Sequence, residues 1–322
     1  MATIDDIIKL SGASRSTVNR FLAGQQVRDD NAKRIKLAMK ELGYRPDKLV
    51  EKRKCTIEII GGDGCGKPAE FQGFAQMLIH MIKALEEGGA TVQMQSGSSQ
   101  YAPKADGVIL YGLSAESEDK YIEILKKRKI PFVFAYRAID RPGISYVTCD
   151  NYLAAYEMTE MLIKDGHRNI AVCGASSANR NMEEKYRGFV DCMKDHNMTI
   201  RSNLVLKANE HEAVDKWIRN LFDTKEEFSA FFALRDRHAL DFHEIAREYG
   251  YSVPDDFSTV GMDGSIEVVY AKPKLSSVTI PYEKIGRKTA ETIFRLIDNP
   301  DTASIREVLK YEMVLRESYR HN

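Results

Sequence analysis

The feature that most constrains this chain is a regular alternation, from Cys55 onward, of short apolar runs with longer stretches of helical periodicity. The strand-like runs are 56–60, 91–95, 107–111, 132–136, 146–149, 170–173, 230–234 and 258–262. The helix-like stretches are 70–87, 116–128, 151–165, 183–196, 211–222, 236–250 and 282–298. This alternation predicts an α/β body with parallel sheets covered on both faces, in which ligands bind beyond the carboxyl ends of the strands.

The first 54 residues differ from this body in pattern and in charge. They hold 13 Lys and Arg against 7 Asp and Glu, a net charge of +6, whereas the other residues hold 34 against 40, a net charge of −6. Thr3 and Asp6 are spaced as a capping box, and Gly12 suits the left-handed residue of a tight turn. Ser14 is placed to cap a second helix, 15–22, and a third begins near residue 29. Two short helices joined by a Gly-containing turn predict a helix-turn-helix.

The second helix of such a motif lies in the major groove of DNA. Arg, Asn and Ser side chains can bond base edges, while hydroxyls at a helix N-terminus suit phosphates. The residues expected to touch DNA are Ser14, Arg15, Ser16, Thr17, Asn19 and Arg20. A three-helix bundle with a solvated basic face has the same spacing, so charge and spacing alone leave that alternative open.

Both parts of the chain resemble the lactose/galactose-repressor family. In the head the family pattern is matched at Thr3, Gly12, Ser14, Thr17, Val18, Arg20, Leu22, Leu42, Gly43, Tyr44 and Pro46. The resemblance implies a DNA-binding transcriptional regulator, foremost a repressor, and not an enzyme. It also implies that Arg15, Ser16 and Arg20 read bases, and that a homodimer binds a near-palindromic operator.

The body resembles the family's periplasmic-binding-protein-like effector domain of two Rossmann-like lobes. The matching runs are 104–110, 131–137, 145–151, 166–173, 186–189, 249–263, 275–281 and 313–318. The resemblance implies a helix-turn-helix domain at 1–46, a hinge at 47–54 and an effector-binding and dimerisation domain at 55–322. Within that domain we expect lobe one at about 55–148 and 279–304, and lobe two at about 149–278 and 305–322.

The hinge departs from the family, whose hinge helix inserts a Leu wedge into the minor groove. Arg53 occupies the aligned wedge position, and an Arg in a narrow minor groove is also physically sensible. Leu49 would serve as the wedge in a shifted register.

Matched motifs in the body imply a site for a small polar, sugar-type effector. Its expected contacts are Phe71, Arg137, Asn181, Glu183, Arg187, Arg235, Asp236 and Asp263. Arg187, in the motif R-G-F, is the expected clamp, because a guanidinium fork suits a carboxylate, a phosphate or paired hydroxyls; an ion pair between lobes is the other reading of it.

Arg235 stands where the family has a small polar contact. A long cation there favours an anionic effector, a sugar phosphate or a sugar acid, over a neutral sugar. The alternative is that Arg235 pairs with Glu183 or Asp263 and fills the pocket, which would leave a regulator with no small ligand.

Enzyme chemistry finds little support. Residues 61–68, GGDGCGKP, satisfy the G-x-x-x-x-G-K pattern of a phosphate loop, but Pro68 stands where Ser or Thr would hold magnesium. An α/β enzyme with a degenerate phosphate loop is therefore a remote alternative. Neither a Gly-x-Ser-x-Gly motif nor a metal-spaced His pair occurs, so no cofactor or metal is expected.

The chain is expected to work in the cytoplasm, away from membranes. Its five cysteines are scattered and odd in number, which does not encode a disulfide framework. No apolar run approaches 18 residues, and the first residues lack the pattern of a secretory signal.

Overall fold

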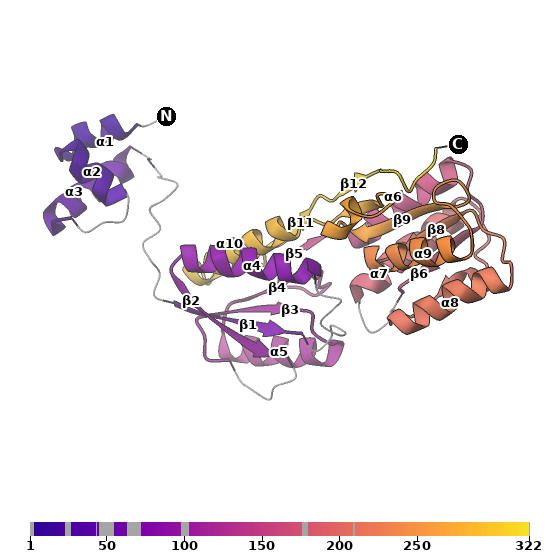
Figure 1. Cartoon of the computed structure of the whole chain (residues 1–322). Coiled ribbons are helices and arrows are strands. Elements are labelled where there is room, and N and C mark those ends of the chain that lie inside the picture. The colour runs from indigo at the N-terminus through magenta and orange to yellow at the C-terminus, as the bar shows by residue number, and fades with distance from the viewer. Residues whose placement is uncertain are drawn as a thin grey trace. The chain divides into compact units, whose positions relative to one another are not determined.

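A computed structural model describes residues 3–22, 27–42, 44, 55–62, 72–97, 103–175, 180–208 and 210–321. The chain divides into two compact units, an N-terminal head that ends near Cys55 and a body that holds most of the rest (Figure 1). Each is described by itself.

The head is a bundle of three helices, α1 (Ile4–Ser11), α2 (Arg15–Leu22) and α3 (Asp29–Glu41). The expected capping box is present, because the Thr3 N–H donates to the Asp6 carboxylate (2.8 Å) and the Asp6 N–H donates to Thr3 Oγ1 (3.3 Å). Gly12 has φ 64°, and its N–H donates to the Ile8 carbonyl (3.0 Å), which ends α1. Local sequence signals thus fix both ends of the first helix.

The head has a core of its own, to which all three helices contribute. Ile7, Val18 and Ile35 are fully buried, one from each helix. The other buried members are Ala13, Phe21, Ala38 and Met39. Because these positions recur at helical spacing, the opposite face of each helix is left to solvent.

The first lobe of the body is built on a six-stranded sheet with the order β11-β5-β4-β3-β1-β2. The pairs β1–β3, β3–β4, β4–β5 and β5–β11 are parallel. The strands are β1 (Cys55–Gly61), β2 (Ala90–Ser96), β3 (Gly107–Tyr111), β4 (Phe132–Ala135), β5 (Ser145–Cys149) and β11 (Arg306–Leu309).

Helices cover both faces of this first sheet (Figure 1). On one side, α5 (Ala115–Arg128) packs Tyr121 and Leu125 against Val108 and Phe134 of the strands. On the other side lie α4 (Gln72–Glu87) and α10 (Tyr282–Asp298), and α10 contacts β3, β4 and β5.

The second lobe repeats this plan with the strand order β12-β10-β9-β8-β6-β7. Its pairs are parallel except for β10–β12, which is antiparallel. The strands are β6 (Ile170–Cys173), β7 (Val205–Leu206), β8 (Ala230–Ala233), β9 (Ser258–Asp263), β10 (Ser276–Thr279) and β12 (Glu312–Val314). The helices are α6 (Asn151–Lys164), α7 (Arg180–Asp195), α8 (His211–Asp223) and α9 (Asp236–Glu248), with the short 3-10 helices η2 (Ser202–Leu204) and η3 (Ile266–Val269).

The predicted alternation is confirmed, with one shift in the lobe boundary. Strand β11 pairs in parallel with β5, so residues 306–309 belong to the first lobe, whereas the sequence placed everything from 305 in the second. The strand escaped detection because its residues alternate between exposed and half-buried, which gives no apolar run. The last passage between lobes therefore follows Leu309.

The chain passes between the lobes three times, after β5, after β10 and after β11. Neither lobe is continuous in sequence. Among the helices of the described residues, none is both long enough and apolar enough to cross a membrane.

Candidate DNA-binding face and inter-lobe cluster

Helix α2 turns a polar face to solvent. Val18 is fully buried and Phe21 nearly so, which holds the opposite face of the helix in the core of the head. The Ser14 hydroxyl accepts from the Thr17 N–H (3.2 Å) and so caps the helix as expected. The exposed residues of this face are Ser14, Arg15, Ser16, Asn19 and Arg20, with Thr17 half-buried.

Arg15, the first residue of α2, forms an ion pair with Asp5 in the first turn of α1. Arg15 Nη2 donates to Asp5 Oδ1. Both side chains are 64% exposed, so the pair lies at the surface of the head. The predicted wedge residues Leu49 and Arg53, and Phe71 of the body, lie outside the described residues.

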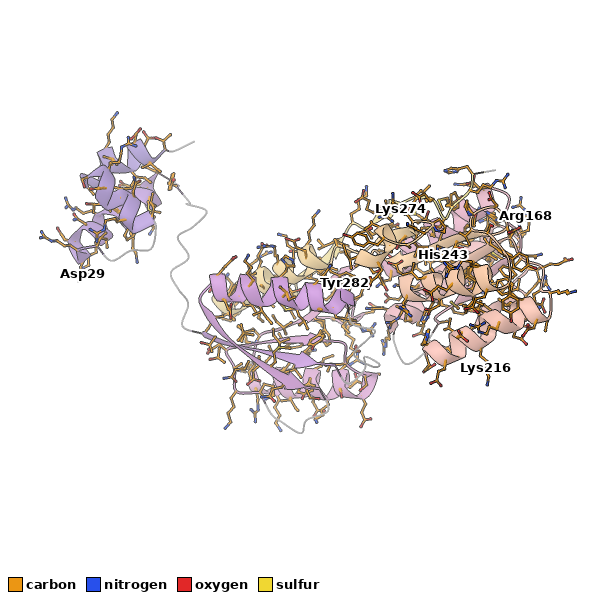
Figure 2. The ribbon with its side chains drawn as sticks, viewed as in Figure 1. Asp29, Arg168, Lys216, His243, Lys274 and Tyr282 are labelled. Carbon is orange, nitrogen blue, oxygen red and sulfur yellow. The ribbon has the colours of Figure 1, made fainter. Side chains whose placement is uncertain are left out.

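In the body, polar side chains from both lobes meet at the carboxyl ends of the strands. We call this set the inter-lobe cluster; it comprises Tyr136, Asn181, Lys185, Asp236, Asp263 and Tyr282. They are supplied by the end of β4, by α7, by the start of α9, by the end of β9 and by the start of α10, where Figure 2 labels Tyr282. This is the edge at which parallel α/β sheets bind ligands.

A buried ion pair lies at the centre of the cluster. Lys185 is fully buried, and its Nζ donates to Asp263 Oδ1 (2.8 Å) and to the Leu234 carbonyl (3.0 Å). The Tyr282 hydroxyl donates to the same Asp263 oxygen (3.3 Å). Charged side chains that are buried in proteins are usually paired and hydrogen-bonded in this way.

Asp263 has two features typical of a functional residue. Its φ is 131°, a conformation that L residues rarely adopt and that clusters at binding sites. Its side chain is 23% exposed, although Lys185 beside it is buried completely. The carboxylate thus keeps some access to solvent while its Oδ1 is held by two donors.

Three hydrogen bonds of the cluster join the two lobes. Asn181 Nδ2 donates to the Tyr136 carbonyl (2.8 Å), the Tyr136 hydroxyl donates to Asn151 Oδ1 (2.9 Å), and the third is the bond from Tyr282 to Asp263. The rings of Tyr136 and Tyr282 pack edge to face with centroids 5.1 Å apart. Burial, and next the charge of Asp263, raise the pKa of both hydroxyls well above the ordinary value, so they remain donors.

Asp236 is held in place by the strands beside it. The Ser277 hydroxyl donates to its Oδ1 (2.5 Å) and the Ser265 N–H to its Oδ2 (2.7 Å). Burial, and next the negative charge of Asp263, raise the pKa of Asp236 above the usual range of a carboxyl group. Its hydrogen bonds tie the start of α9 to β10 and to the segment between β9 and η3.

Arg187 and Glu183, two of the expected effector contacts, are exposed on α7. The Arg187 guanidinium lies over the ring of Tyr152 on α6, 4.8 Å from its centroid. Lys185, which is not among the expected contacts, lies in the cluster. Its spacing was a usable signal, because Asn181, Lys185 and Phe189 recur every four residues and share the buried face of the helix.

The other two cations expected at the effector site differ in their surroundings. Arg137 is buried and bonded to Glu118 of α5 within the first lobe (Nε–Oε1 2.7 Å). Arg235, half-buried between β8 and α9, lies close enough to Tyr282 and His238 to influence both. Burial raises the pKa of Tyr282 and lowers that of His238, and the charge of Arg235 lowers both.

The described part of the chain holds no group of His, Cys, Asp and Glu side chains arranged to bind a metal ion. The inter-lobe cluster itself consists of hydrogen-bond donors, acceptors and aromatic rings, which are groups that suit a polar organic ligand.

Comparison with known proteins gives matches over both parts of the chain. Residues 3–47 match the family described as bacterial regulatory proteins, lacI family, and residues 159–319 match the periplasmic binding protein-like domain. The HTH-type transcriptional regulator CelR of Thermobifida fusca is 28% identical, with 98% of each chain covered. The probable HTH-type transcriptional repressor ExuR of Bacillus subtilis is 24% identical, with 99% of each covered.

Solved structures show the same likeness. A complex of the transcriptional regulator CelR with cellobiose superposes with a TM-score of 0.72 at 27% identity, covering 99% of this chain and 100% of the other. The lac repressor dimer bound to operator and the anti-inducer ONPF has a TM-score of 0.72 at 16% identity, with 98% of each chain covered, which is a likeness of fold.

Proposed function

We propose, from the premise that this chain belongs to the lacI family of bacterial regulatory proteins, that it is a repressor which binds a near-palindromic operator as a homodimer and answers to a small sugar-type effector. The chain is a DNA-binding transcriptional regulator and not an enzyme. Its place of action would be the cytoplasm, where the operator is.

The observation that carries the DNA-binding proposal is the exposed polar face of α2. In it Arg20 and Arg15 offer forks that can bond a guanine edge, and Ser16 and Asn19 offer shorter donors and acceptors. Ser14 and Thr17 lie at the N-terminal end of the helix, where phosphates are favoured. Leu49 and Arg53 remain proposed minor-groove contacts of the hinge.

Replacing Arg20 tests this assignment. We expect Arg20→Ala to weaken binding to the best site by about 1–3 kcal/mol and to relax the preference at one base pair of each half-site. Arg34→Ala, which removes an exposed cation of α3, is the matched control and should change affinity almost equally for all sequences. Unchanged binding of Arg20→Ala to its best duplex, measured by fluorescence anisotropy, would mean that α2 is not the reading helix.

The inter-lobe cluster is the proposed effector site. The partly exposed Asp263 carboxylate can accept hydroxyl hydrogens of a sugar, while the buried Tyr282, packed edge to face on Tyr136, holds its Oδ1. A relative's complex with cellobiose supports a saccharide as the class of ligand. Asn181 and Asp236 belong to the cluster, and Arg137, Glu183 and Arg187 stay proposed contacts.

Arg235 beside the cluster favours an effector that carries a negative charge, a sugar acid or a sugar phosphate. Isothermal titration calorimetry with matched pairs of neutral, acidic and phosphorylated sugars tests this. We expect the charged member of a pair to bind more tightly, and to lose that advantage in Arg235→Gln. Tighter binding of the neutral members would contradict the anionic class.

A second candidate is a regulator whose pocket is filled by its own side chains. Its support is the pair of Lys185 with Asp263, together with the hydrogen bonds that already join the lobes. In that case no sugar of the panel would alter operator binding, whereas an effector-controlled repressor would show a shift in DNA affinity. By thermodynamic linkage, the change in the free energy of DNA binding equals the difference in the ligand's binding free energy between the DNA-bound and the free protein. This coupling is typically about 1–3 kcal/mol.

A further inference from the structure

Asp5 is an acid on a surface that is proposed to approach a polyanion. DNA presents a dense row of negative phosphates, so a carboxylate on the binding face opposes association unless it is neutralised. Asp5 lies in the first turn of α1 and is bonded to Arg15, the first residue of the reading helix. Its presence there calls for a physical reason.

Helix capping does not supply that reason. The neighbouring Asp6 already accepts from the Thr3 N–H and from the Thr3 hydroxyl (both 2.8 Å) and completes the capping box. Asp5 has no part in that box, and its carboxylate is directed to another helix.

Fold stability does not supply it either. Both partners are 64% exposed, and exposed ion pairs contribute at most about 1 kcal/mol. The contact between α1 and α2 is already secured by the buried core of the head, to which Ile7 and Val18 belong.

The pair does change what Arg15 can do. An arginine has five N–H donors, and one carboxylate oxygen on Nη2 leaves four of them free of Asp5: the Nε hydrogen, both Nη1 hydrogens and one Nη2 hydrogen. Held in this way, the guanidinium loses less rotamer freedom when it meets a guanine. The same bond partly neutralises Arg15, so an indiscriminate contact with a phosphate becomes less favourable.

We propose that Asp5 is a positioning residue that fixes the Arg15 guanidinium for one base pair of each half-site and keeps it from the phosphate backbone. Asp5 thereby determines specificity without touching a base. This inference rests on the proposed reading face of α2.

The experiment uses the full chain and a duplex selected from a random pool by the wild-type protein. Binding by fluorescence anisotropy is measured for that duplex and for each of its single base-pair substitutions. The proteins are wild type, Asp5→Asn, Arg15→Ala, the double variant and the control Asp30→Asn. Asp30 is matched to Asp5, because it also lies in the first turn of a helix and pairs with an exposed arginine, Arg34 (Nε–Oδ2 3.9 Å).

We expect Asp5→Asn to reduce discrimination at one base pair at least about fivefold, at the position that Arg15→Ala also affects. The double variant should match Arg15→Ala there. In Asp5→Asn the slope of log affinity against log salt should steepen by about one, since the released Arg15 would gain a phosphate contact. Asp30→Asn should raise affinity for all duplexes alike.

Three outcomes would overturn the inference or separate it from its premise. An Asp5→Asn effect that is uniform over all duplexes, as for Asp30→Asn, would show that Asp5 acts through charge alone. An unchanged discrimination at the base pair sensitive to Arg15 would likewise overturn the positioning role. If Arg15→Ala alters no preference, the premise that Arg15 reads a base fails instead. Circular dichroism of each variant establishes that the head is folded.

Discussion

At the residue scale, His243 shows how burial sets a response to pH. This histidine lies on α9 (Figure 2), and within the described residues neither of its ring nitrogens has a hydrogen-bond partner. Burial lowers its pKa to about 4. In the unfolded chain the ring has its ordinary pKa near 6.5. Between that pH and about 4 the unfolded chain is protonated at His243 and the folded protein is not, so unfolding takes up a proton. Stability is therefore lost as the pH falls from about 6.5 to about 4.

Replacing this ring should remove its part of the acid sensitivity. The wild-type protein is expected to lose about 2 kcal/mol at pH 5 through His243, relative to neutral pH. His243→Leu fills much of the same volume without a titrating group, so its free energy of unfolding should fall less on acidification. Urea unfolding at several pH values measures this. The same pH profile in both proteins would show that His243 takes up its proton without unfolding.

Single residues were predictable from sequence where their partners are near in the chain. Thr3 and Asp6 are three residues apart, and their capping box follows from spacing alone. Lys185 was missed because it stands outside the matched motifs, and its contact with Asp263, 78 residues away, forms only once the strands have assembled. Arg187 was selected from a motif, yet the helix turns it toward Tyr152.

At the element scale, the packing of α6 on α7 depends on a residue without a side chain. A Cβ on Gly188 would lie 2.2 Å from the Tyr152 carbonyl oxygen and 3.0 Å from the Tyr156 nitrogen, both backbone atoms of α6. Backbone cannot move aside as a flexible side chain can. Gly188 therefore sets how closely the two helices approach.

Two effects oppose each other in Gly188→Ala. Alanine in a helix is favoured over glycine by about 1 kcal/mol, whereas forcing extra volume into a packed contact typically costs about 1–3 kcal/mol. Because the clash is with backbone, we expect net destabilisation, seen as a lower midpoint in denaturant unfolding. A variant more stable than wild type would mean that the helices can separate without loss.

Strands with an apolar run and helices with a clear periodicity were predictable, and the shortest strands were not. The runs 107–111 and 170–173 coincide with β3 and β6, and the stretch 282–298 coincides with α10. The four missed strands, β7, β10, β11 and β12, have two to four residues each. A strand of this length cannot give a long apolar run, and whether it forms depends on neighbouring strands that are distant in sequence.

At the scale of the whole molecule, exposed apolar side chains at η3 offer a surface for the proposed dimer. Ile266, Val269 and Tyr270, in and directly after η3, are exposed at 58, 38 and 76%. Apolar side chains gathered on a surface are typical of interaction sites. The fold class followed from the alternation of strands and helices in the sequence, but partner surfaces leave no comparable periodic signal.

Sedimentation equilibrium at micromolar concentration should give twice the mass of one chain. Two heads held together would bind both halves of a near-palindromic operator, which one weakly binding head cannot do. Tyr270→Glu should shift the protein toward monomer and weaken operator binding while the far-ultraviolet circular dichroism stays unchanged. A tetramer would contradict the proposed dimer. A Tyr270→Glu variant that remains fully dimeric would show that the exposed residues at η3 are not the dimer interface.

The three passages between the lobes also govern how this chain can be made. A ribosome releases β11, the edge strand of the first sheet, only after five of the six strands of the second sheet have emerged. The earlier half of the molecule thus waits, with the flank of β5 unpaired, for a segment synthesised far later. Nascent chains halted before residue 306 should therefore stay sensitive to protease around β5, and become resistant once 306–309 are clear of the exit tunnel.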